Sequence, residues 1–272
     1  MKRSLSILAN ICVVIGVTFM QSGFAQEPPE ISQKPTSIDV NLEYGSFGVV
    51  IVRNDTITVG TDSRVYARGE FADTACKVTE INGVIIATVG LLFSHTGFVF
   101  LDNAKNILGS TGSFDYRLHS YESFVVNEMT SLFDNATSWH DFVVSDSFRQ
   151  INNVHTVFCT FVNGTADIFE GIFVPRCTPA RVVIDTVFRH YAIPSGQFGN
   201  LLFGTRDVRI DSLQQAMRSI MVLPSVAPED IVSIIITQIS RWYPQFVGGD
   251  IDMVQLTADG KVSWIHSKPK CN

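Results

Sequence analysis

Residues 46–90 read SFGVVIVRNDTITVGTDSRVYARGEFADTACKVTEINGVIIATVG, and this stretch decides the fold. It holds four runs rich in Val and Ile, at Phe47 to Arg53, Thr56 to Thr61, Lys77 to Ile81 and Val84 to Val89. The pairs Asn54-Asp55 and Asn82-Gly83 fall inside the two halves and favour tight turns. The stretch therefore predicts two β-hairpins, with residues 62–76 as a loop between them. Because the runs are apolar almost throughout, we expect their sheet to be covered on both faces.

The rest of the chain predicts further helices and strands. Apolar residues at helical spacing predict helices at residues 92–108, 119–134, 210–222 and 228–243. Two more hairpins are predicted, at residues 156–174 and 250–265, whereas Arg181 to Phe188 is ambiguous. This order predicts an α+β fold, a four-layer αββα sandwich in which two antiparallel sheets face each other and helices cover both outer faces.

The first 25 residues have the features of a signal peptide. Lys2-Arg3 forms a basic start, Ile7 to Met20 forms an apolar run, and Gly23-Phe24-Ala25 offers small residues to a signal peptidase. A membrane anchor is the alternative, although the run is short for a bilayer span. We therefore expect an exported protein, periplasmic or secreted, whose mature chain begins near Gln26.

The mature chain divides into a leader and a domain. Residues 26–45 are polar and Pro-rich, which indicates a flexible leader or propeptide. Residues 46–272 are long enough for one large globular domain.

Charge and cysteine content restrict the possible partners. The net charge of −6 becomes −8 when Lys2 and Arg3 leave with the signal peptide. A mildly acidic domain has no electrostatic reason to bind nucleic acid or an anionic membrane. An oxidising compartment would allow one or two disulfides in three possible pairings among the cysteines that remain, which are Cys76, Cys159, Cys177 and Cys271.

Ser46, Asp62 and Lys77 lie at the ends of predicted strands in an order that suggests an N-terminal nucleophile. A serine hydroxyl needs a base, and an α-amine with a pKa of about 7.7–8.0 is partly neutral near pH 7. Cleavage between Gly45 and Ser46 would make Ser46 both nucleophile and base. Lys77 would favour the neutral amine and the alkoxide, and Asp62 would hold Lys77 charged. Alternatively, Ser46 begins a strand of an uncut chain, and Lys77 and Asp62 have structural or surface positions.

Four segments of the chain carry specific motifs: GVVIVRNDTITVGTDSRV, CKVTEINGVIIATVG, YAIPSG and VGGDIDMVQLTADGKVSWI. Together they resemble proteasome β-type subunits of the Ntn-hydrolase superfamily, and the resemblance covers roughly residues 46 to 266. It implies the αββα fold, hydrolysis of a peptide or other amide substrate, and assembly into a homo-oligomeric ring. It implies no cofactor and no metal.

The resemblance also implies roles for five residues. Ser46 matches the nucleophile, Asp62 and Lys77 match the buried charged pair, and Gly90 matches the backbone donor to the oxyanion. Alternatively, Gly90 has no catalytic role and is simply the glycine at the end of a strand. Ser195 matches a serine that lies beside the terminal amine. Alternatively, Ser195 caps a short helix from Gln197 to Phe203, and we favour this second interpretation.

Three departures from the family favour a second function. Pro244 and Val247 stand where the family has an aspartate and a serine that poise the amine, and serine replaces the usual threonine at position 46. The alternative is therefore a catalytically inactive proteasome-fold subunit with a structural or binding role. A third option is an amidase or acylase of the wider superfamily that acts on a small substrate.

Overall fold

The computed structural model describes residues 46–67, 70–72, 75–90, 100–134, 153–178, 181–204, 225–244 and 247–266. Apart from residues 225 and 226, all of them belong to one compact unit, formed by Asn41–Arg206 and Ala227–Asn272. The predicted signal peptide, the leader and the helix at 210–222 lie outside the described residues. None of the described helices combines the length and the apolar character that a membrane crossing requires.

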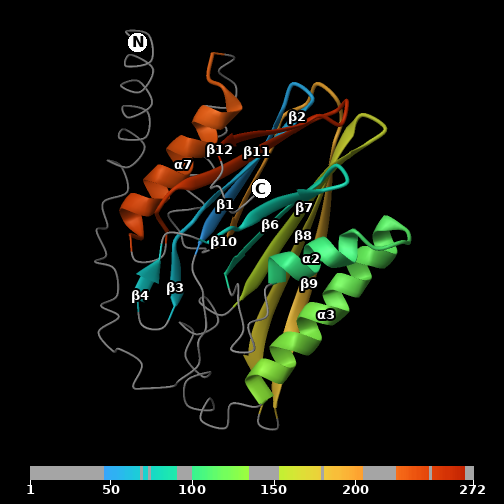
Figure 1. Ribbon diagram of the computed structural model, residues 1–272, viewed down its shortest axis with the longest axis vertical. Coiled ribbons are helices and arrows are strands. Elements are labelled where there is room, and N and C mark those ends of the chain that lie inside the picture. Colours follow the sequence, from blue (N-terminus) through green and yellow to red (C-terminus); the bar gives the residue numbers. More distant parts are fainter. Residues whose placement is uncertain are drawn as a thin grey trace. The chain divides into compact units, whose positions relative to one another are not determined.

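The first sheet has five antiparallel strands in the order β10-β1-β2-β11-β12. Their bounds are β1 Phe47–Arg53, β2 Thr56–Asp62, β10 Gly199–Gly204, β11 Ile251–Thr257 and β12 Val262–His266. Helix α7 (Pro228–Trp242) packs against β1, β2 and β11 (Figure 1). The contact is close, because a Cβ atom on Gly60 of β2 would lie 2.3 Å from Val232 Cγ1 of α7. Pro228 begins the helix, where its missing N–H costs no hydrogen bond.

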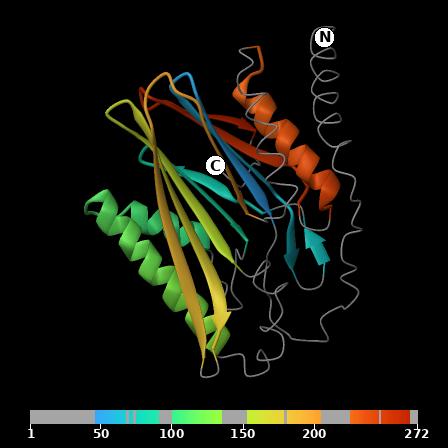
Figure 2. The same cartoon turned by 180° about the vertical axis from the view of Figure 1, so that it is seen from behind.

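The second sheet also has five antiparallel strands, in the order β5-β6-β7-β8-β9. Their bounds are β5 Val78–Ile81, β6 Val84–Gly90, β7 Val154–Val162, β8 Thr165–Cys177 and β9 Val182–Ile193. Helix α2 (Phe100–Leu108) packs against β5 and β6, and helix α3 (Phe114–Asp134) packs against β8 and β9 (Figure 2).

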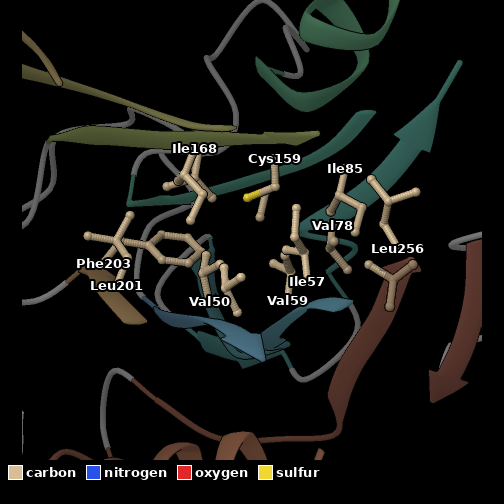
Figure 3. Close-up of a cluster of buried hydrophobic side chains, with 14 of the residues drawn as sticks. Val50, Ile57, Val59, Val78, Ile85, Cys159, Ile168, Leu201, Phe203 and Leu256 are labelled. Carbon is tan, nitrogen blue, oxygen red and sulfur yellow. The ribbon is translucent and has the colours of Figure 1, made fainter. Parts of the chain in front are cut away.

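The main core lies between the two sheets. Val50, Ile57 and Phe203 of the first sheet pack toward Ile85 and Cys159 of the second, and all five are at most 1% exposed (Figure 3). Burial of each aliphatic or aromatic side chain stabilises the fold by about 1.5–3 kcal/mol. The core thus fixes which faces of the two sheets meet.

The structure shows the bonding state of two of the cysteines. Cys76 is disulfide-bonded. Cys159 is a free thiol inside the core, and burial raises its pKa far above the usual range. Because Cys159 is free, two disulfides among Cys76, Cys159, Cys177 and Cys271 are excluded.

The structure confirms a mixed α+β fold with antiparallel sheets, including both hairpins of residues 46–90, the hairpin of β7 and β8, and helix α7. Of the ambiguous segment from Arg181 to Phe188, all residues from Val182 onward belong to β9. The predicted loop 62–76 contains a short hairpin of β3 (Val65–Ala67) and β4 (Glu70–Ala72).

The helix predicted from Gln197 to Phe203 is wrong, because Gly199–Gly204 forms strand β10. This strand pairs with β1 along its length and places Leu201 and Phe203 in the core. Pairing with β1 and burial of two large side chains outweigh the local helical preference of the Asn-Leu-Leu-Phe run.

Candidate active site

Three chain segments meet where β1 begins and bring Ser46, Asp62 and Lys77 together. Ser46 immediately precedes β1, Asp62 is the last residue of β2, and Lys77 immediately precedes β5. Ser46 is 1% exposed, and Asp62 and Lys77 are fully buried. The two sheets therefore bring together three polar side chains that are far apart in sequence.

The Lys77 ammonium group has three acceptors for its three protons. It donates to Asp62 Oδ1 at 3.1 Å and to the Arg64 carbonyl oxygen at 2.5 Å. Its third acceptor is Ser46 Oγ. A lysine that is buried this completely and donates three hydrogen bonds next to a carboxylate is held in its charged form.

The Asp62 carboxylate accepts hydrogen bonds from three backbone N–H groups as well as from Lys77. Oδ1 accepts from Phe47 N at 2.9 Å, and Oδ2 accepts from Gly248 N at 2.9 Å and from Arg64 N at 3.2 Å. Four donors fill the hydrogen-bonding capacity of the two carboxylate oxygens. Asp62 thus joins the start of β1, the end of β2 and the loop before β11.

Ser46 combines an engaged hydroxyl group with a strained backbone. Its Oγ donates to the Arg64 carbonyl oxygen at 3.3 Å and accepts from Lys77. Its φ of 138° lies in a region that side-chain-bearing residues avoid. Such a conformation costs about 1–3 kcal/mol and persists only where the surroundings enforce it.

Gly90 lies at the same end of the second sheet as Lys77. The Thr88 N–H donates to the Lys77 carbonyl oxygen at 2.8 Å, and Gly90 ends the same strand two residues later. Its φ of 93° requires glycine, and a Cβ atom would lie 2.1 Å from the Asn153 carbonyl oxygen. This geometry accounts for glycine at the strand end, and it also leaves Gly90 near the candidate site.

The structure does not bring Ser195 to this group. Ser195 lies in the turn between β9 and β10, where the Gly196 N–H donates to Asp55 Oδ1 at 3.2 Å. Because β10 is antiparallel to β1, with Gly199 opposite Val52 and Gly204 opposite Phe47, this turn lies at the far end of β1 from Ser46.

Sequence reasoning missed the backbone part of the site. The Gly248 carbonyl oxygen accepts from Ser63 N at 3.1 Å and from Arg64 N at 3.0 Å, while its N–H donates to Asp62. Arg64 Nη1 donates to the Pro244 carbonyl oxygen, so the side chain braces the loop that carries Gly248. The Gly248-Gly249 pair is the available sequence signal, because two glycines allow close backbone approach as well as a tight loop.

Gly248→Ala is expected to lower the free energy of unfolding by about 1 kcal/mol, the usual worth of one hydrogen bond. The new Cβ atom would lie 2.7 Å from Arg64 Cζ and would displace the guanidinium group from Pro244. Urea titration measures the effect. In an Arg64→Ala background, the same change is expected to cost less than about 0.5 kcal/mol, and an equal cost in both backgrounds would refute the steric explanation.

Searches of the chain against known protein families and against curated proteins find no match. Among the described residues, no group of three or more His, Cys, Asp or Glu side chains is placed to hold a metal ion.

Proposed function

We propose that this chain is an exported Ntn hydrolase of the proteasome β type, with the four-layer αββα arrangement. In this proposal it cuts itself between Gly45 and Ser46 and then hydrolyses peptide or other amide bonds with Ser46. The packing of α7 on one sheet and of α2 and α3 on the other supports that arrangement. Export and assembly into a ring of like chains rest on the sequence features alone.

The contact of Lys77 Nζ with Ser46 Oγ is the observation that carries the proposal. A buried ammonium group beside a hydroxyl favours the alkoxide, because attraction between charges is strong away from water. Lys77 itself is a poor base, since Asp62 holds it protonated. The group that removes the hydroxyl proton must therefore be another one, and the α-amine that cleavage would liberate on Ser46 is the nearest by covalent connection.

Self-cleavage follows from the same geometry. Ser46 Oγ attacks the carbonyl carbon of residue 45, the C–N bond to Ser46 breaks, and the Ser46 nitrogen takes up the hydroxyl proton. Water then hydrolyses the ester and leaves a free α-amine on Ser46. The strain at Ser46, whose φ is 138°, favours this reaction because cutting the bond removes the constraint on φ.

Hydrolysis of an amide bond in a substrate would use the same residues after self-cleavage. The α-amine takes the Ser46 hydroxyl proton as Oγ attacks the substrate carbonyl, and the proton then passes to the leaving amine. Lys77 stabilises the negative charge on Oγ before attack, and the Gly90 N–H stabilises the oxyanion. Water releases the acyl group from Ser46 in the final step.

A non-catalytic subunit of the same fold is the second candidate. The side chains of Pro244 and Val247 hold no donor or acceptor, so neither offers a hydrogen bond to an amine. Val247 is fully buried, and the backbone carbonyl oxygen of Pro244 already accepts from Arg64. The Ser46 hydroxyl also donates to the Arg64 carbonyl oxygen, which supports a structural role for Ser46 in an uncut chain.

Intact mass and peptide-amide hydrolysis by purified wild type and Ser46→Ala distinguish the two candidates. The hydrolase proposal expects the wild type to start at Ser46 and the variant to keep the preceding segment and to be inactive. Ser110→Ala, which alters an exposed serine after α2, is the control and should be cut and active. A wild type that starts near Gln26 and hydrolyses nothing would instead support the binding subunit.

A further inference from the structure

We propose that His155 is a positioning residue for Ser46, which holds the start of β1 in place through Gly204 and releases it when the imidazole gains a second proton. The inference rests on the proposed function only in its choice of Ser46 as nucleophile. The positioning itself can be measured in an uncut, inactive chain.

His155 connects the two sheets at the Ser46 end of β1. It lies on β7 of the second sheet, is 1% exposed, and its Nδ1 accepts a hydrogen bond from the Gly204 N–H at 3.0 Å. Gly204 is the last residue of β10 in the first sheet. The imidazole also packs edge-on against Phe203, with ring centroids 5.5 Å apart. A side chain of the second sheet thus fixes the end of a strand of the first.

Gly204 in turn packs against the first peptide group of β1. It lies opposite Phe47 in the β1–β10 ladder, and its φ of 109° requires glycine. A Cβ atom at this position would lie 2.4 Å from the Ser46 carbonyl oxygen. The N–H of the same peptide group, from Phe47, donates to Asp62 Oδ1. The peptide that joins Ser46 to Phe47 therefore lies between Asp62 and Gly204, and movement of Gly204 would move Ser46.

The hydrogen bonds determine the tautomer of His155. Because Nδ1 accepts from Gly204, the ring proton is on Nε2, which donates to Glu170 Oε1 at 2.8 Å. Glu170 Oε2 accepts from Tyr191 OH at 2.8 Å and from Arg189 Nη1 at 3.2 Å. Glu170, the neutral His155 ring and the Gly204 N–H are thus joined by consecutive hydrogen bonds.

Acid would break this series of hydrogen bonds at His155 Nδ1. A second proton on His155 must go to Nδ1, which then faces the Gly204 N–H as a donor and no longer accepts from it. Burial alone would raise the pKa of Glu170, but the hydrogen bond from His155, the charge of its protonated ring, the hydrogen bond from Tyr191 and the charge of Arg189 lower it to about 2. Burial raises the pKa of Tyr191. Glu170 therefore stays ionised in mild acid.

Two substitutions separate the functions of the two ring nitrogens. In His155→Asn, the side-chain oxygen can take the place of Nδ1 and accept from Gly204. In His155→Gln, the longer side chain can reach Glu170 but leaves no acceptor at the Nδ1 position. His190→Asn is the matched control, because His190 lies on the neighbouring part of the second sheet and pairs with Asp167 in an exposed position.

Amide hydrogen exchange at Phe47 and Gly204, in the full chain carrying Ser46→Ala, tests the positioning. We expect His155→Gln to speed exchange at least about tenfold, and His155→Asn and His190→Asn to stay within about threefold of the parent. Exchange in the parent, corrected for the intrinsic effect of pH, should rise between about pH 7 and about pH 5, whereas His155→Asn should show no such rise. In the corresponding chains that keep Ser46, self-cleavage should be slowest in His155→Gln and should stay near the parent rate in His155→Asn and His190→Asn.

Equal exchange in the two His155 variants, or a parent profile without the acid-dependent rise, would overturn the positioning role. If exchange behaves as expected but no chain is ever cut, the positioning stands and the proposed function fails. If the chain is cut but exchange does not distinguish the variants, the proposed function stands and the positioning fails.

Discussion

Lys77→Met is expected to lower the rate of peptide-amide hydrolysis at least about 1,000-fold and the free energy of unfolding by about 3–5 kcal/mol. Methionine keeps most of the side-chain volume but removes the charge beside Ser46 Oγ. It also leaves Asp62 as a buried anion with only backbone N–H partners. Steady-state kinetics and urea titration measure the two effects.

A double variant separates the effect on catalysis from the effect on folding. In Asp62→Asn/Lys77→Met, neither buried charge remains, so stability should recover by at least about 1 kcal/mol relative to Lys77→Met while activity stays absent. Lys105→Met, on the exposed face of α2, is the control and should leave both quantities unchanged. A Lys77→Met protein with wild-type activity would show that Lys77 is only structural.

The second large effect is a loss of stability in acid that depends on Glu170. Its pKa is lowered from 4.5 to about 2 in the folded protein, although burial alone would raise it. The stabilisation is therefore complete above the unfolded pKa and is lost as the pH falls from about 4.5 through about 2. At about 1.4 kcal/mol for each pH unit, the loss amounts to about 3 kcal/mol.

Urea titrations at several pH values check this prediction against Glu170→Gln. The wild type should lose about 3 kcal/mol more than the variant between about pH 4.5 and about pH 2. Glu128→Gln, on helix α3, should follow the wild type. Parallel pH profiles for wild type and Glu170→Gln would show that the network around Glu170 does not stabilise the ionised form.

Local sequence signals account for the elements that were predicted correctly. The hairpin of β1 and β2 and the hairpin of β5 and β6 have dense β-branched runs around Asn-Asp and Asn-Gly turns, which determine structure over a few residues. Strand β10 could not be predicted in this way. Its residues suit a helix, and its conformation depends on pairing with β1, which lies about 150 residues earlier in the chain.

The candidate site likewise contains residues that the sequence could predict and groups that it could not. Ser46, Asp62 and Lys77 carry chemistry in their side chains, and their positions at strand ends made them visible in the sequence. The Gly248 N–H and the Arg64 carbonyl oxygen are backbone groups with no signature of their own. His155 is one histidine among six, and only the meeting of β7 with the end of β10 gives it significance.

The mass of the polypeptide that carries the activity tests the central claim most directly. An electrophile that traps the nucleophile of an active preparation, followed by mass spectrometry, identifies both the labelled residue and the start of the labelled chain. We expect a chain that begins at Ser46 and carries the label on that residue. A fully active, labelled chain that still includes Gly45 would contradict the claim, because its Ser46 nitrogen would be an amide and could not act as the base.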